Sequence, residues 1–171
     1  MPRDLFRVTV DEYNYTNLLG KSDKIQVPES IALNDEDIAD ALPEEITIPD
    51  ELRLWAINEG SPAANEYEGY MSSNDGLLFW KVGRGRAPNE KRYVGVGEIG
   101  ELFKTDANTA RRLFQTPTAR LMFTVKSFTQ IEKTPEDVQP ILGYKQHPQR
   151  TQRVKPNRYN TVESALNQLR E

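Results

Sequence analysis

Apolar residues along the chain recur in short blocks whose spacing favours β-strands over long helices. The blocks that predict strands are Leu5–Val10, Leu52–Asn58, Gly76–Val82, Arg92–Ile99 and Ala119–Phe128. The third of them, GLLFWKV, is apolar almost throughout and therefore predicts a buried strand. Residues 59–74 are rich in Gly, Ser, Asn and Pro, which predicts a loop that is helical for one turn at most.

Helix signals lie between and after these blocks. Each predicted helix begins after a side chain that can accept a hydrogen bond from the backbone of the first turn. These capping residues are Asn34, Asp106, Thr134 and Thr161. Pro140 should keep the third helix short, while Val162, Leu166 and Leu169 align on one face of the last one.

The order of these elements predicts an α+β fold with a small curved barrel and short flanking helices. Short strands without the spacing of parallel crossovers argue against a doubly wound sheet. The length of 171 residues fits one domain with extensions. We expect an acidic N-terminal extension over residues 1–50, a recognition domain over 51–146, and a basic tail with a final helix over 147–171 that leads into a further domain of a longer protein.

Charge is distributed unevenly along the sequence. Residues 1–51 contain 4 Lys and Arg against 13 Asp and Glu, a net charge of −9. Residues 80–171 contain 17 against 9, a net charge of +8. A basic second half indicates a polyanionic partner such as nucleic acid, although a solvated surface with clustered charge is an alternative explanation.

Composition excludes several kinds of chemistry. The chain has no cysteine, and its one histidine, His147, lies in a polar stretch, so we expect no metal and no His-dependent triad. Gly95, Gly97 and Gly100 match a dinucleotide-binding pattern but lie inside a predicted strand, so we expect no cofactor. No apolar run would span a membrane, and no apolar signal core opens the chain. We therefore expect a cytoplasmic protein that is not an enzyme.

Aromatic residues cluster near the first loop of the predicted barrel. Trp55, Tyr67, Tyr70, Phe79 and Trp80 fall within 26 residues, and Asn58 and Asn65 lie beside them. Aromatic faces with neighbouring amides are what a pocket for a nucleobase requires. A hydrophobic core is the competing explanation. It is the better one for Phe79, it stays open for the two tyrosines, and at least one tryptophan should pack inside.

Basic residues follow the same strands. The candidates for phosphate contacts are Lys81, Arg84, Arg86, Lys91, Arg92, Arg111 and Arg112. Their places on a turn and a helix face predict a track for a nucleic-acid backbone beside the aromatic loop. For any one of them, a solubilising surface role is the alternative.

Together these segments resemble PUA-like domains of the EVE and YTH type. LRLWAIN, NEYEGYMSSNDG, LLFWKVGRGR and RYVGVGEI match that family's succession of strands and polar loop in order and spacing. The stretch ILGYKQHPQRTQRV is similar to the tail of such modules at the front of modification-dependent restriction proteins, which include McrB-type motors and HNH nucleases. The resemblance covers about residues 52–154.

The resemblance implies that the domain flips a base of DNA, methylated or hydroxymethylated, into an aromatic pocket. The positions that match the family's pocket are Asn58, Tyr67 or Tyr70, and Trp80. With Trp55 and Asn65 from the aromatic cluster, they make up the expected pocket. The resemblance further implies a specificity role in a restriction system, with a motor or nuclease domain in the same full-length chain. Two alternatives stay open: a PUA-like module that recognises modified RNA, and a protein-interaction domain.

Overall fold

Six strands form one curved sheet in the computed structural model, which describes residues 3–10, 53–81, 92–114 and 116–171, the side chain of Arg112 excepted. The strands are β1 (Leu5–Val10), β2 (Leu54–Ile57), β3 (Gly76–Lys81), β4 (Tyr93–Lys104), β5 (Leu121–Lys133) and β6 (Gln152–Arg153). Their order across the sheet is β2-β5-β4-β3-β1-β6. The helix predicted after Asn34 lies outside the described residues, as does the basic turn that includes Arg84, Arg86 and Lys91.

The N-terminal strand lies in the interior of this sheet. β1 pairs in parallel with β3, from Leu5 opposite Gly76 to Val10 opposite Lys81, and antiparallel with β6 on its other side. The strand predicted at Leu5–Val10 is thus confirmed. The sheet takes in β1 and β6, which lie on either side of the 51–146 range that the sequence indicated for the domain.

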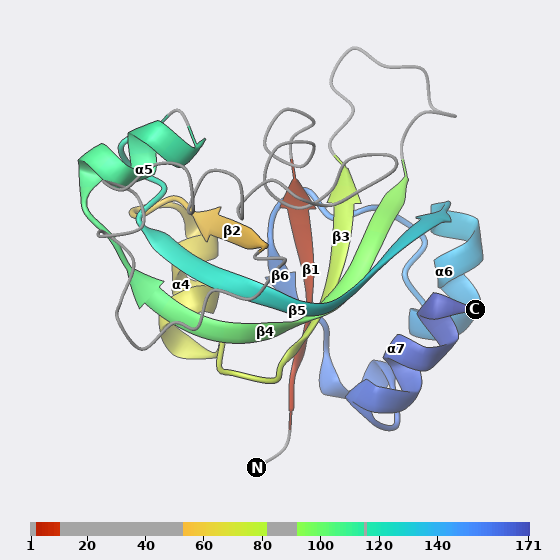
Figure 1. Ribbon diagram of the computed structural model, residues 1–171. Helices are drawn as coiled ribbons and strands as arrows, with labels where there is room; N and C mark the ends of the chain where they lie inside the picture. The colour runs from red at the N-terminus through yellow and green to blue at the C-terminus, as the bar shows by residue number, and fades with distance from the viewer. Residues whose placement is uncertain (1–2, 11–52, 82–91, 115) are drawn as a thin grey trace.

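Curvature comes from the two long strands. β4 and β5 pair over most of their length, and their register shifts at three places, between Tyr93 and Gly95 among others. Such bulges bend a strand and increase its twist. A Cβ atom on Gly95 would lie 2.5 Å from the ring of Phe128, so this glycine permits a close approach of the two strands. Figure 1 shows both strands bending across the molecule.

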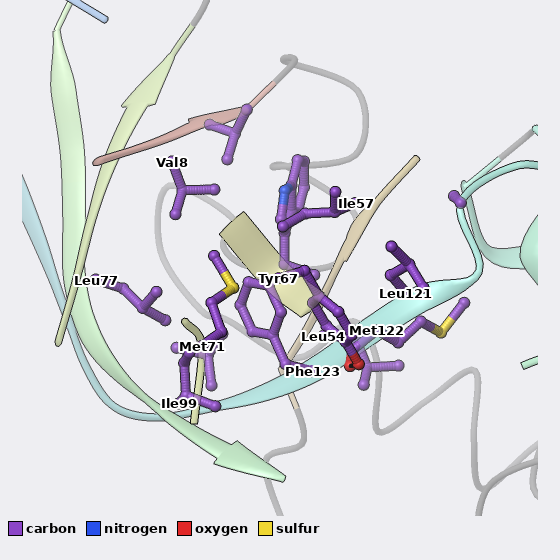
Figure 2. Packing of buried hydrophobic residues seen from close by; sticks show 14 of the residues in the cluster. Val8, Leu54, Ile57, Tyr67, Met71, Leu77, Ile99, Leu121, Met122 and Phe123 are labelled. Atoms are coloured by element: carbon purple, nitrogen blue, oxygen red, sulfur yellow. Dashed lines mark hydrogen bonds between the residues drawn. The ribbon is translucent and has the colours of Figure 1, made fainter. Parts of the chain in front are cut away.

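Each face of the sheet carries its own hydrophobic cluster. The first cluster includes Phe6, Leu77 and Phe123, together with side chains from the edge strand β2. The helices α4 (Pro62–Gly69) and α5 (Ala107–Phe114) also contribute to it. Figure 2 shows this packing. The second cluster includes Trp80 and Tyr93, and the helices α6 (Pro135–Leu142) and α7 (Val162–Arg170) lie over it. Figure 1 shows the two helix pairs at opposite sides of the molecule.

Three helices begin where the sequence predicts. Asp106 Oδ1 accepts a hydrogen bond from Thr109 N at 2.7 Å, and the Thr161 side chain accepts one from Ser164 N. Thr134 forms a reciprocal capping box with Asp137. Among the described residues, no helix is long and apolar enough to cross a bilayer.

One secondary-structure prediction was wrong. The segment expected as a loop contains α4, an eight-residue helix with Pro62 at its beginning. Proline suits the first helical position because its missing N–H has no partner there in any case. Burial of Tyr67 on the inner face of the helix adds tertiary contacts that the Gly and Asn content of the flanks does not reveal.

Candidate functional site

A cavity of about 410 Å³ lies where the curled sheet stays open. The two edges of the sheet are β2 and β6, which have four residues and two residues, respectively. The cavity is lined by Trp55–Asn58 from one edge, and by Thr9, Val10 and residues 149–151 from the side of β1 and β6. We call it the seam cavity. Its volume lies within the range of about 300–1,000 Å³ that is usual for small-molecule sites.

Two aromatic rings form a wall of the seam cavity. Trp55 lies on β2, opposite Phe123 of β5, and Phe114 is the last residue of α5. Their rings meet edge to face, with centroids 5.6 Å apart and planes at 90°. Each ring is about 5% exposed, so the pair is held firmly while both residues border the cavity. Aromatic surface of this kind can pack against a flat heterocycle.

Polar groups surround the aromatic wall. Asn58 lies at the end of β2, and its Oδ1 accepts a hydrogen bond from Thr118 Oγ1 at 3.0 Å. This bond uses the amide oxygen and does not involve the two N–H donors of the side chain. Ser61 Oγ donates to the backbone carbonyl of Asn58 at 2.6 Å, and Thr151 Oγ1 accepts from Thr9 N at 3.3 Å. The cavity therefore combines an apolar wall with fixed amide and hydroxyl groups, as a site for a nucleobase edge requires.

Of the six predicted pocket residues, Trp55 and Asn58 line the seam cavity. The structure does not bring the other four to it. Asn65 is exposed on α4 and borders a shallower hollow. Tyr70 is 50% exposed just after the same helix, with the Arg153 guanidinium 4.2 Å from its ring centre.

Tyr67 belongs to the core. Its hydroxyl donates toward the carbonyl oxygens of Met122, at 2.8 Å, and Phe103, at 3.1 Å. Burial raises the pKa of this hydroxyl well above its usual range. Figure 2 shows the side chain in the first hydrophobic cluster, near Leu54 and Met71. The sequence left both core and pocket open for Tyr67, and the helix places the ring in the core.

Trp80 packs in the second cluster, on the opposite face of the sheet from Trp55. Its ring lies edge-on to Tyr93, with centroids 4.8 Å apart, and stacks on His147 at 4.9 Å. With 2% of its surface exposed, Trp80 has no open face toward the seam cavity. The expectation that at least one tryptophan packs inside describes Trp80.

Three of the seven predicted phosphate contacts have described side chains, and these lie in two places. Lys81 and Arg92 are half-buried where β3 and β4 meet, and Lys81 N donates to Arg92 O at 3.0 Å. Arg111 is exposed on α5, the helix that brings Phe114 to the cavity. The side chain of Arg112, like Arg84, Arg86 and Lys91, is not among the described parts.

Sequence reasoning missed Phe114 and residues 149–151 as parts of the site. Phe114 reads as a core residue because it shares a helix face with Ala110 and Leu113. Gln149 and Arg150 lie in the basic tail, and only the curl of the sheet brings them opposite β2. The one local signal was the run of polar and basic residues after Tyr144.

Metal-binding chemistry finds no support in the described ranges. No group of three or more His, Cys, Asp or Glu side chains in them is arranged to hold an ion. The pKa of the Asp75 carboxyl is raised by burial, but this group accepts hydrogen bonds from Asp4 N at 2.9 Å and Ser72 N at 2.8 Å, away from the seam cavity. Asp75 therefore joins the starts of β1 and β3 and is part of the scaffold.

Comparisons with known proteins find similarity among solved structures. No model of a known protein family matches the chain, and no curated protein matches it in sequence. Among solved structures, the chain is similar to the N-terminal domain of Thermococcus gammatolerans McrB bound to m5C DNA. The similarity covers 96% of this chain and 95% of that one, with a TM-score of 0.63 and 16% sequence identity. The predicted α+β architecture is confirmed, and this protein has the fold of the McrB N-terminal domain.

Proposed function

We propose that this protein binds DNA and recognises a modified base, of the 5-methylcytosine class, by taking it out of the duplex into the seam cavity. The observation that carries the proposal is the aromatic wall of Trp55 and Phe114 at the open seam of the fold. The similar McrB domain was solved bound to m5C DNA. Recognition is the whole of the proposed activity, and cleavage or translocation would be supplied by another domain in a modification-dependent restriction system.

The energetics of base flipping fit such a site. Removing a base from the stack costs a few kcal/mol. Stacking on an aromatic side chain returns about 1–3 kcal/mol, and hydrogen bonds to the base edge add to it. Trp55 and Phe114 offer the stacking surface, and Asn58 with Thr151 offers the polar contacts. Selectivity for a methyl group follows if the apolar wall contacts it, because burying one CH₂-sized group is worth about 0.8 kcal/mol.

The chain contains two tryptophans, which allows a direct test. In a Trp80→Phe variant, Trp55 is the sole source of tryptophan fluorescence. Addition of a duplex with one m5C should quench this signal, because the flipped base stacks on or beside the indole. The unmodified duplex should quench it less and at higher concentration. A Trp55→Phe variant, which reports Trp80 alone, serves as the matched control and should show little change.

Equal quenching of Trp55 by modified and unmodified duplexes would contradict recognition of the modified base. Quenching of Trp80 instead of Trp55 would place the base on the other face of the sheet. Duplexes with methylated adenine or hydroxymethylated cytosine identify the preferred base. Competition by RNA of the same sequence tests the RNA-binding alternative, which predicts that RNA displaces the bound DNA duplex.

A further inference from the structure

A segment rich in basic residues borders the seam cavity. Residues 143–158, the basic segment, contain five lysines and arginines and no aspartate or glutamate. The segment leads from the end of α6 past the seam cavity, through β6, to the short 3₁₀ helix at Pro156–Arg158. Its sequence places a strong positive charge at the rim of the proposed base site.

Hydrogen bonds attach the basic segment to the sheet. Val154 N donates to Leu5 O at 2.7 Å, and Arg7 Nη1 donates to Gln146 O at 3.0 Å. Arg158 Nη1 donates to Gly143 O at 2.8 Å, which closes the segment on itself. The shape of the segment is therefore set before any ligand arrives, which lowers the entropic cost of binding.

Tyr144 organises the cations inside this segment. The guanidinium carbon of Arg7 lies 3.8 Å from the centre of the Tyr144 ring, and that of Arg158 lies 4.3 Å from it. Aromatic faces attract guanidinium groups and hold them in place. Arg7 is only 5% exposed, and no ion pair joins it to a carboxylate in the described parts of the chain. A buried cation without a counter-charge favours an anion nearby.

A second cavity, of about 510 Å³, opens beside Arg7. Lys145, His147 and Arg158 line it, and its described lining includes no acidic residue. Gln149 lines both this cavity and the seam cavity. The two hollows therefore share a lining residue, and the basic segment contributes to both.

The outward-facing cations of the segment contrast with cations elsewhere. Lys145, Arg150 and Lys155 are exposed, and within the described ranges none of them forms an ion pair. By comparison, Lys104 pairs with Glu68 at 2.9 Å, and Arg120 lies 3.6 Å from Glu59. Arg153 of the same segment lies 3.7 Å from Asp4, so the charge that no described carboxylate neutralises is that of Lys145, Arg150 and Lys155.

From these observations we propose that the basic segment holds the phosphate backbone of the DNA strand whose base enters the seam cavity. Arg150, at the rim, takes the phosphate next to the flipped nucleotide. Lys145 and Lys155 take phosphates further along, and Arg7 supplies a fixed positive field beneath them. This inference rests on the proposed function, because the base that enters the seam cavity decides which DNA strand the segment would hold. The track predicted from Lys81 to Arg112 stays a separate prediction, since much of it lies outside the described residues.

The test measures how the affinity for DNA depends on salt. A variant with Lys145→Ala, Arg150→Ala and Lys155→Ala is compared with the natural sequence on m5C and unmodified duplexes. Log affinity falls as log salt rises, and each lost phosphate contact makes this slope less steep by about 1. The slope of the triple variant should therefore be less steep by roughly 3. The preference for m5C should persist, because the seam cavity keeps its aromatic wall.

A matched control removes the same charge elsewhere. Lys104→Ala with Lys126→Ala and Lys133→Ala alters three lysines that line neither cavity. This variant should keep a slope close to that of the natural sequence. The inference is wrong if the slope of the basic-segment variant is unchanged, or if the slope of the control becomes less steep by the same amount. In either case, a retained preference for m5C leaves the proposed function intact.

The reverse outcome is also distinguishable. If the natural sequence binds both duplexes alike but the basic-segment variant loses its slope, the phosphate track stands and recognition of the modified base fails. If RNA of the same sequence displaces DNA at equal concentration, the occupant is RNA and the inference as stated is wrong. An absence of DNA binding at low salt contradicts both proposals.

Discussion

The two faces of the sheet each hold one tryptophan, and the two tryptophans have different surroundings. Trp80 is enclosed by Tyr93 and His147 in the cluster that α6 and α7 cover. Trp55 is nearly as buried, yet it forms part of the wall of a cavity. The difference arises because α6 and α7 lie directly over one cluster, whereas β2 and residues 149–151 approach each other without pairing on the other face.

This comparison shows that residue type does not separate a core aromatic from a binding aromatic. Both tryptophans lie on predicted strands, and both have apolar neighbours in the sequence. What separates them is the closure of the layer above. Substitutions that alter one hydrophobic cluster and leave the other intact therefore test which tryptophan belongs to the core and which to the binding site.

The largest effect is expected from truncating the enclosed tryptophan. Trp80→Ala should lower the free energy of unfolding by about 3–5 kcal/mol, because it removes a large side chain from a closed cluster. Trp55→Ala should cost less stability, since that ring already borders open volume, and it should abolish the preference for m5C. Urea denaturation and duplex binding measure the two effects. A Trp80→Ala protein with normal stability would show that the second cluster is not closed.

Tyr67→Phe should destabilise the protein by about 0.5–1.5 kcal/mol, since it removes the hydrogen bonds that a buried hydroxyl donates to the carbonyls of Phe103 and Met122. Binding to m5C DNA should not change, because the hydroxyl points into the core. Tyr70→Phe is the matched control, and the 50% exposure of that ring predicts a change within about 0.5 kcal/mol. A loss of m5C preference in Tyr67→Phe would show that this residue takes part in binding.

A smaller effect is expected at the start of α7. Thr161→Ala removes the hydrogen bond from Ser164 N, 3.0 Å long, and should cost about 1 kcal/mol. Fraying of this helix would loosen the cover of the second cluster and leave the seam cavity unchanged. Thr161→Ser keeps the hydroxyl and should retain most of the stability. Thermal unfolding of the three proteins, followed by circular dichroism, checks the order.

The smallest effect concerns pH and Asp75, which joins the starts of β1 and β3. Burial raises the pKa of this carboxyl, so the folded state takes up a proton more readily than the unfolded state. Its contribution to stability therefore increases as pH falls through the raised pKa of the folded state toward the value of the unfolded chain. Asp75→Asn removes this titration, so the stability of the natural protein relative to the variant should increase on acidification. A difference that is constant or decreasing as the pH falls from neutral toward the ordinary pKa of an aspartate, about 4, would contradict this sign.

Local patterns were enough to predict much of the fold. The run GLLFWK is buried at all but its last residue and became β3, and the capping side chains Asp106, Thr134 and Thr161 begin helices as expected. α4 escaped prediction because its stability depends on Tyr67 packing against strands that are distant in sequence. The interior position of β1 escaped for the same reason, since parallel pairing leaves no local signature.

The candidate site was predictable only in part. Trp55 and Asn58 were recognised because they lie on one strand and at its end, where a local pattern operates. Phe114, Arg150 and Thr151 join them through the curl of the sheet, which depends on bulges between β4 and β5. Arg7 was missed as well, because a single arginine in an alternating strand ordinarily faces solvent, whereas here Tyr93 and Tyr144 cover it.

The interior place of β1 also bears on how quickly the chain folds. Asp4 and Asp75, which are bonded at the start of the β1–β3 pair, are 71 residues apart, and Thr9 and Thr151 are 142 residues apart. Contacts between residues so distant in sequence require the closure of long loops, and proteins rich in them fold slowly. During synthesis, the first strand leaves the ribosome long before either of its neighbours exists. It can pair with β3 once residues 76–81 have been made, but its other side stays unpaired until residues 152–153 follow, so the sheet is completed late.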